Sequence, residues 1–111
     1  MSNSKYCVIT VAVETKEQAA TISRCLVMNR LAACVQTTKI SSVYVWDGEY
    51  REHDELLLLI KTEKDMFTEI EKTVHHLHEY DVPEILCLDV TRGSHDYLRW
   101  ITDAVSTRSS N

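Results

Sequence analysis

The chain has 111 residues, of which 44% are hydrophobic and 26% charged, and its formal net charge is -5 at pH 7. This length and apolar content suit one domain over residues 1–111, with an ordered core from about 5 to 105. The acidic balance argues against nucleic acid and anionic membrane surfaces as partners, because both attract clustered Lys and Arg. No apolar run approaches the ~18 residues of a spanning helix, so no membrane insertion is expected.

The N-terminus and the cysteines bear on the compartment. Residues 1–5 hold no apolar segment behind a basic start, so no signal peptide is expected. The four cysteines, Cys7, Cys25, Cys34 and Cys87, form no CxxC pair and stand in apolar runs. This pattern is typical of four buried, reduced thiols, and it predicts a cytoplasmic protein.

The first elements are a strand and a helix. Residues 6–13 are rich in β-branched residues and almost continuously apolar, which predicts a strand buried on both faces. Thr15 and Gln18 then fit a capping box, in which Thr15 accepts from the first-turn amides and Gln18 reaches back. The helix that follows should end near Asn29 and Arg30.

A long hairpin follows. Residues 34–46 and 49–62 predict two strands, because both are rich in β-prone residues. Asp47 and Gly48 between them are typical of a two-residue type I′ turn.

The last third of the chain predicts a helix, a strand and a second helix. Thr62 is expected to cap the first of these helices, which ends in the run from His75 to His78. Residues 85–90 form the predicted strand, which Gly93 ends, and Ser94 caps the last helix. Three apolar stripes support this order: Phe67, Ile70, Val74 and Leu77 on one helix, Ile85 to Leu88 on the strand, and Leu98, Ile101 and Val105 on the last helix. Residues 106–111 are expected to be a frayed polar tail.

The fold class is therefore α+β: a ferredoxin-like βαββαβ sandwich with a long extended hairpin and a C-terminal helix. The expected strand order is 4-1-3-2, with the first two helices on one face of an antiparallel sheet. Hairpin strands of ~12 residues exceed the usual 5 or 6 and carry apolar and aromatic side chains at the tip. Exposed edges and apolar patches favour self-association. The alternative is a bent hairpin folded back on its own sheet.

Several motifs together resemble the CutA family. They are Leu31-Ala-Ala-Cys-Val35, Ser42-Val-Tyr-Val-Trp-Asp-Gly48, the run from Glu55 to Thr62, His78-Glu-Tyr-Asp-Val-Pro-Glu84, and Tyr97-Leu-Arg-Trp100. The resemblance covers residues 6 to about 105. It implies a ferredoxin-like homotrimer, similar in architecture to PII signalling proteins and linked to tolerance of divalent cations, copper above all.

The resemblance also bears on a metal site. Some members of that family are thought to bind copper through a first-strand thiol and two adjacent histidines. Those positions correspond here to Thr10, Leu77 and His78, so this chain lacks the thiol and one of the two histidines of that set. Topology places Thr10, His78, Tyr80 and Glu84 at one sheet edge. There the imidazole of His78 and the carboxylate of Glu84 could bind a divalent metal ion. The alternative is a hydrogen-bonded cluster that fixes a subunit junction.

Two further features of the sequence allow two interpretations each. His75, His76 and His78 lie at the end of a helix, where His75 and His78 can share one face. Adventitious surface binding of a metal there is the alternative to plain solvation. Tyr44 and Trp46 line either a cleft between subunits or a packed interface.

No enzyme is expected, because no nucleophile, base and oxyanion donors converge in the sequence. The contiguous Ser94, His95 and Asp96 cannot converge as a triad does. The expected function is that of a trimeric, non-enzymatic protein of metal-ion response, with no required cofactor and weak binding of a divalent metal, copper above all. The alternative is a PII-like module that binds a small molecule or a partner protein in clefts between subunits.

Overall fold

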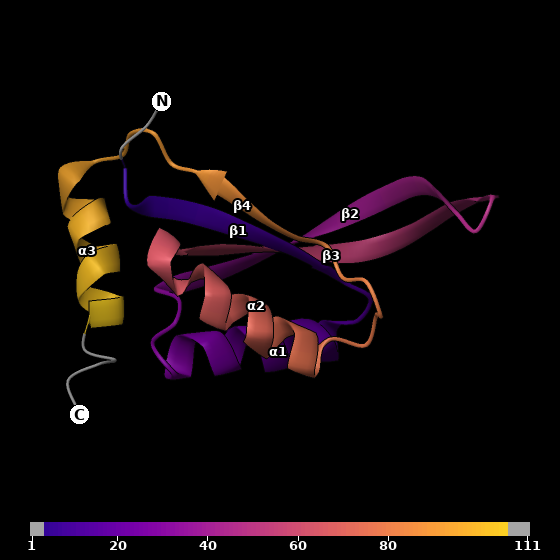
Figure 1. Cartoon of the computed structure of the whole chain (residues 1–111), viewed down its shortest axis with the longest axis horizontal. Coiled ribbons are helices and arrows are strands. Elements are labelled where there is room, and N and C mark those ends of the chain that lie inside the picture. The colour runs from indigo at the N-terminus through magenta and orange to yellow at the C-terminus, as the bar shows by residue number, and fades with distance from the viewer. Residues whose placement is uncertain (1–3, 107–111) are drawn as a thin grey trace.

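The computed structural model describes residues 4–106. Its elements in chain order are β1 (Tyr6–Val13), α1 (Lys16–Met28), β2 (Cys34–Trp46), β3 (Glu49–Glu63), one 3-10 turn (Lys64–Met66), α2 (Phe67–Leu77), β4 (Ile85–Asp89) and α3 (His95–Ser106). This order confirms the ferredoxin-like α+β fold with an added C-terminal helix (Figure 1). The predicted polar tail lies, apart from Ser106, outside the described residues, as do positions 1–3 of the segment searched for a signal peptide.

The four strands form one antiparallel sheet in the order β2-β3-β1-β4, as predicted. β1 lies between two partners, and pairs with β3 from Tyr6 opposite Glu63 onward. Its pairing with β4 stops at Val11 opposite Ile85. β1 therefore continues for two residues beyond the end of its neighbour β4.

One face of the sheet packs on α1 and α2, which lie side by side beneath it in Figure 1. Because successive side chains of a strand point to opposite faces, the odd-numbered residues of β1 and the even-numbered residues of β3 from Leu58 onward share this inner face. The buried apolar residues there are Cys7, Ile9, Val11 and Val13 of β1, Ile22 and Leu26 of α1, Leu58 and Ile60 of β3, and Ile70 and Val74 of α2. This core fixes the register of the sheet, since a slip by one residue would expose it.

The predicted capping box of α1 is half right. The hydroxyl of Thr15 accepts the amide N–H of Gln18 at 3.1 Å. The side chain of Gln18 does not reach back, because its Nε2 donates to the carbonyl of Leu77 on α2 at 3.4 Å. A tertiary partner has replaced the local one.

Thr62 does not cap α2, contrary to the sequence prediction. It lies inside β3, fully buried, and its hydroxyl donates to the carbonyl of Leu31 at 2.6 Å. β3 continues to Glu63, and the 3-10 turn then leads into α2 at Phe67.

The β2–β3 hairpin projects from the sheet as a long two-stranded arm (Figure 1). At its tip Asp47 and Gly48 have φ angles of 53° and 75°, as a type I′ turn requires. Of the nearby apolar residues, Val43, Val45 and Tyr50 are exposed by 60%, 67% and 65%. The hairpin is thus extended, and the alternative in which it folds back over its own sheet is wrong.

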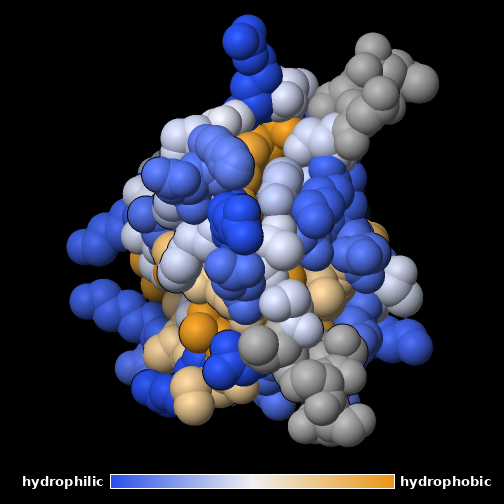
Figure 2. Space-filling view, turned by 90° about the vertical axis from the view of Figure 1, so that its left-hand side faces the viewer, coloured by the Kyte–Doolittle hydropathy of each residue, from blue (hydrophilic) through white to orange (hydrophobic). Residues whose placement is uncertain are grey.

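α3 covers one end of the other, outer face of the sheet. The hydroxyl of Thr102 donates to Glu63 of β3 at 2.6 Å and also bonds the hydroxyl of Tyr6 of β1. Figure 2 shows that the end of the molecule formed by α3 is mainly hydrophilic. The hairpin end of the outer face is left open by this helix.

The four cysteines are all free, but they are not all buried, which corrects the sequence prediction. Cys7 is buried, Cys25 and Cys34 are half-buried, and Cys87 is exposed. Cys87 lies on β4, an edge strand with a neighbour on one side only. Within residues 4–106, no helix has the length and apolarity to cross a membrane.

Candidate functional site

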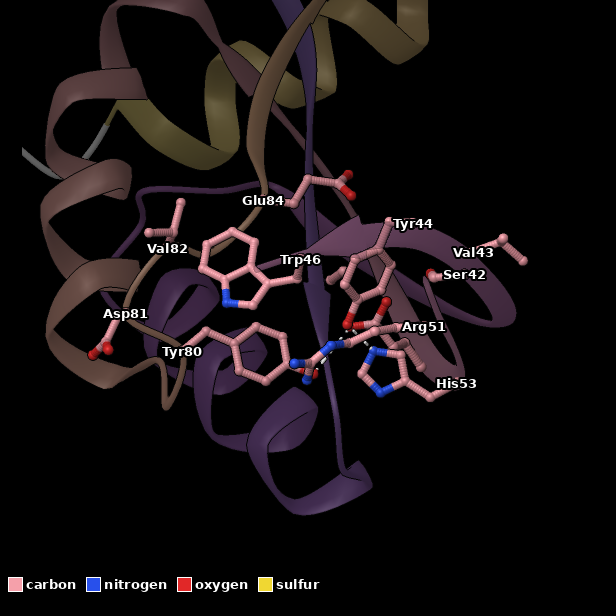
Figure 3. A pocket seen from close by; sticks show the side chains of 12 residues that line it. Ser42, Val43, Tyr44, Trp46, Arg51, His53, Tyr80, Asp81, Val82 and Glu84 are labelled. Atoms are coloured by element: carbon pink, nitrogen blue, oxygen red, sulfur yellow. Dashed lines mark hydrogen bonds between the residues drawn. The ribbon is translucent and has the colours of Figure 1, made fainter. Parts of the chain in front are cut away.

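A cleft of about 690 Å³ opens on the outer face of the sheet, between the hairpin and residues 80–84 (Figure 3). The hairpin contributes Tyr44 and Trp46 from β2, and Arg51 from β3. The register explains this wall, since Tyr44 lies directly opposite Arg51 and same-face residues recur every second position. Ala12 of β1 also lines the cleft.

The hairpin wall is held by a cross-strand aromatic pair. The hydroxyl of Tyr44 hydrogen-bonds Nε2 of His53, and the two rings lie 5.4 Å apart. Arg51 makes an ion pair with Glu49 at 3.6 Å, and Figure 3 shows its guanidinium extending toward Tyr80. The hairpin therefore brings the rings of Tyr44 and His53 and the guanidinium of Arg51 to one side of the cleft.

The opposite wall is anchored by Tyr80 and Glu55. The hydroxyl of Tyr80 donates to Oε2 of Glu55 at 3.0 Å, and Glu55 is itself only 8% exposed. Burial, followed by this hydrogen bond and the charge of Glu55, raises the pKa of Tyr80 well above its usual value near 10. The phenol therefore stays protonated and holds the carboxylate in the cleft.

His78 holds the loop that forms this wall. Its Nδ1 accepts the amide N–H of Tyr80 at 3.0 Å, so Nε2 carries the proton and donates to the carbonyl of Ala12 at 2.6 Å. Ala12 lies in the part of β1 beyond the end of β4, where His78 takes the place of a strand partner. Both ring nitrogens are thus bonded within the chain, and a metal ion would have to displace one of these bonds.

Glu84 stands at the other end of the same wall. Its Oε2 accepts a hydrogen bond from the hydroxyl of Thr10 at 3.0 Å, while the side chain remains exposed and lines the cleft. The structure thus pairs Thr10 with Glu84 and His78 with Tyr80, but it records no bond between His78 and Glu84. Across residues 4–106 no group of three or more His, Cys, Asp and Glu side chains could hold a metal ion. Metal binding at His78 and Glu84 stays a prediction.

Tyr44 and Trp46 were predicted to line either a cleft between subunits or a packed interface, and they line this cleft within one chain. Arg51, His53 and Glu55 were not predicted as cleft residues. The two-residue turn at positions 47 and 48 would have predicted them, because it sets which residues of the two strands share a face. With a two-residue turn, positions 44 and 51 are opposite each other, and positions 53 and 55 follow on the same face. The sequence also placed Tyr80 at this edge with Thr10, His78 and Glu84, and the structure joins them in two pairs, Thr10 with Glu84 and His78 with Tyr80. Val82 had no such signal, because the cleft depends on how an irregular loop crosses the twisted sheet.

Comparison with known proteins identifies the family. The profile of the CutA1 divalent ion tolerance protein family matches residues 7–104. The chain belongs to this family. A CutA divalent-cation tolerance protein from Thermus thermophilus is 42% identical over 86% of this chain and 94% of its own length. A chloroplastic CutA protein from Arabidopsis thaliana is 39% identical over 92% of this chain, which spans only 56% of that relative.

Solved CutA structures share the fold over nearly the whole chain. The CutA of Xylella fastidiosa superposes with a TM-score of 0.89 at 34% identity, covering 92% of this chain and 99% of that one. A periplasmic divalent cation tolerance protein CutA from Archaeoglobus fulgidus gives a TM-score of 0.88 at 30% identity, covering 90% and 98%. The names of CutA relatives include both a chloroplastic and a periplasmic protein, so family membership does not determine a compartment.

Proposed function

We propose that this CutA family member acts in divalent-cation tolerance as a non-enzymatic homotrimer that binds cations weakly, copper above all, at the acidic edge of the cleft. The observation that carries the proposal is the negative charge around the cleft, where Glu55, Asp81 and Glu84 outnumber the single guanidinium of Arg51. Such an excess of negative charge attracts cations. These carboxylates do not converge into a ligand set, so only weak binding is proposed. The relatives are named for tolerance of divalent cations, which supports this reading.

Self-association is supported by the exposed apolar surface. Leu86 and Leu88 on the edge strand β4 are exposed by 58% and 48%, and the hairpin exposes Trp46 by 49%. Unpaired edges and clustered apolar side chains are the features by which strands recruit another chain. The number three rests on the family resemblance.

The test is titration calorimetry with copper(II) and zinc(II) on protein purified without a histidine tag. We expect weak, saturable binding that both Glu84→Gln and His78→Ala reduce. The matched control is a His75→Ala/His76→Ala variant, which removes two exposed histidines of α2 and should bind as the parent does.

His78→Ala also removes two hydrogen bonds of the loop, so its thermal melting must be recorded beside the titration. Glu84→Gln keeps the shape of the side chain and serves as the cleaner variant. Binding that survives Glu84→Gln, or that only the His75→Ala/His76→Ala control abolishes, would exclude the cleft as the cation site.

A second function is favoured by the aromatic lining of the cleft. Tyr44, Trp46 and Tyr80 surround a space large enough for a small organic molecule, as a PII-like module would need. A thermal-shift screen of nucleotides and metabolites tests this, with Trp100→Phe leaving Trp46 as the sole tryptophan reporter in the cleft. A screen without any stabilising compound, and without a change in Trp46 fluorescence, would count against it.

We also propose that the protein acts in the cytoplasm and that it requires no cofactor. The four free cysteines support a reducing compartment. Fractionation of cells that produce the protein, followed by immunoblotting, tests the location.

A further inference from the structure

The cleft carries opposite charges at its two ends. Figure 3 shows the carboxylate of Glu84 on one side of the ring of Trp46 and the guanidinium of Arg51 on the other side, where it extends toward Tyr80. The ring of Tyr44 stands beside Trp46, between the same two charged groups. An acidic end, an aromatic middle and a basic end therefore follow one another across the cleft.

Both charged ends have hydrogen-bonding capacity left for a ligand. One oxygen of Glu84 accepts the hydroxyl of Thr10 at 3.0 Å, and within residues 4–106 the other oxygen has no hydrogen bond. Arg51 uses one terminal nitrogen in its ion pair with Glu49 at 3.6 Å, and a guanidinium carries five N–H donors. Both side chains are exposed. Each end can thus bind a group of opposite charge and keep its protein partner.

The other two carboxylates of the cleft are placed differently. Glu55 is nearly buried and already accepts the hydroxyl of Tyr80. Asp81 is exposed, but Figure 3 shows its carboxylate pointing away from the ring of Trp46. Glu84 is therefore the carboxylate beside the aromatic middle that a ligand can reach.

We propose that the cleft binds an ω-amino acid, a small molecule with an ammonium group at one end of an alkyl chain and a carboxylate at the other. The ammonium pairs with Glu84. The carboxylate pairs with Arg51, whose forked N–H groups match a carboxylate. The alkyl chain lies against the rings of Trp46 and Tyr44, and the negative faces of these rings also attract the ammonium.

The same arrangement disfavours other classes of small molecule. An α-amino acid carries both charged groups on one carbon, so they do not reach across the width of an aromatic ring. A nucleotide brings phosphate charges into a cleft where carboxylates outnumber the guanidinium, and a simple amine leaves Arg51 without an anion. This ligand class rests on the proposed small-molecule function, which it makes specific. All the groups involved come from the hairpin and residues 80–84 of one chain, so the site does not use the free edge of β4.

The test is a titration of the full-length protein with 6-aminohexanoate, followed by calorimetry and, in the Trp100→Phe variant, by the fluorescence of Trp46. Three control ligands share its chain length: hexylamine lacks the carboxylate, hexanoate lacks the ammonium, and norleucine is the isomer with both groups on one carbon. We expect 6-aminohexanoate to bind about 10- to 100-fold more tightly than each control, the gain typical of one hydrogen-bonded charge pair.

Two variants assign the ends of the site. Arg51→Gln should lower the affinity for 6-aminohexanoate to that of hexylamine without weakening hexylamine itself, and Glu84→Gln should lower it to that of hexanoate. The matched control is Lys39→Gln, which removes a positive charge from the opposite face of β2 and should bind as the parent does. Light scattering in the same solutions checks that the mass stays constant, because Trp46 is also an exposed apolar residue of the hairpin.

The proposal is overturned if 6-aminohexanoate binds no more tightly than norleucine and the singly charged analogues, or if Arg51→Gln leaves its affinity unchanged. If other metabolites stabilise the protein while 6-aminohexanoate does not bind, the ligand class is wrong but the small-molecule function stands. Silence from every compound counts against both. A metal ion at Glu84 has no need of a guanidinium, so Arg51→Gln also separates this site from the proposed cation site.

Discussion

His78 illustrates what a single side chain does at the edge of this sheet. The sequence located it near Glu84 and left two roles open, metal ligand or member of a hydrogen-bonded cluster. The structure gives both ring nitrogens protein partners, Tyr80 on one side and Ala12 on the other. The sequence places the residue but not its hydrogen bonds. These bonds form because β1 extends two residues past Ile85, the first residue of β4, and leaves the carbonyl of Ala12 without a strand partner on that side.

Tyr80 should make the stability of the protein fall at alkaline pH. Its native pKa is raised above 10, so the unfolded chain releases this proton first as pH increases. The stabilisation is complete below about pH 10 and is lost as pH rises from there toward the native pKa. Tyr80→Phe should therefore flatten the decline of the free energy of unfolding above pH 10, measured by urea denaturation, and cost about 1 kcal/mol at pH 7 through the lost bond to Glu55.

Glu55→Gln provides the companion measurement for Tyr80. It removes the charge that contributes to the raised pKa but keeps the phenol, so its alkaline decline should lie between those of the parent and Tyr80→Phe. Equal slopes in the parent and Tyr80→Phe would show that Tyr80 is not shielded as the geometry indicates.

At the scale of elements, the sequence predicted the order, the strand pairing and the type I′ turn, because apolar periodicity and turn residues act locally. It missed the 3-10 turn between β3 and α2. Thr62 looked like a cap because it follows an apolar run, but its hydroxyl satisfies a carbonyl of a distant segment. Local sequence cannot show a tertiary acceptor, and the same reason accounts for Gln18.

The N-cap of α1 should contribute measurably to stability. Thr15→Ala removes the acceptor for the amide of Gln18 and should lower the free energy of unfolding by about 1 kcal/mol. Thr21→Ala, at an exposed position inside the same helix, is the control and should change it by a few tenths of a kcal/mol at most. Similar losses in both variants would contradict capping as the cause, because Ala has a higher helix propensity than Thr and Thr21→Ala should not by itself destabilise the helix.

Gly48 should control the local stability of the hairpin tip. Its φ angle is 75°, and a residue with a Cβ in this conformation is destabilised by about 1 kcal/mol relative to glycine. The Cβ itself would meet no other atom within 4 Å. Gly48→Ala should therefore speed amide hydrogen exchange around the turn and leave the exchange of Ile9 and Ile60 unchanged. Asp47→Gly, which relieves a left-handed residue, should not speed exchange at the tip; slowed exchange in Gly48→Ala would contradict the argument.

At the scale of the whole molecule, the length of the hairpin predicted an extended arm, and the structure confirms it. The shape of the cleft was not predictable, because it arises where the twisted hairpin passes residues 80–84, and the twist is a property of the assembled sheet. The exposure of Cys87 was missed for a related reason. The apolar run at residues 85–88 predicts a strand, but it does not show whether another strand or a helix covers the side chain of Cys87.

Association should depend on the outer side of β4. Leu86→Glu places a charge on an apolar residue that is 58% exposed on the open face, and it should convert oligomer to monomer in size-exclusion chromatography with light scattering. Met28→Glu, at a residue 74% exposed near the end of α1, is the matched control and should leave the mass unchanged. A parent protein that is monomeric at every concentration would refute self-association outright.

The central position of β1 has a consequence for synthesis on the ribosome. β1 is synthesised before both of its partners, β3 and β4, so Cys7 can pair only after Thr62 and then Asp89 have been made. The β2–β3 hairpin, whose strands are adjacent in sequence, can close before β1 docks. During that interval the most apolar strand of the nascent chain has no partner, which makes it the natural target for a chaperone and the segment most prone to mispairing between neighbouring polysomal chains.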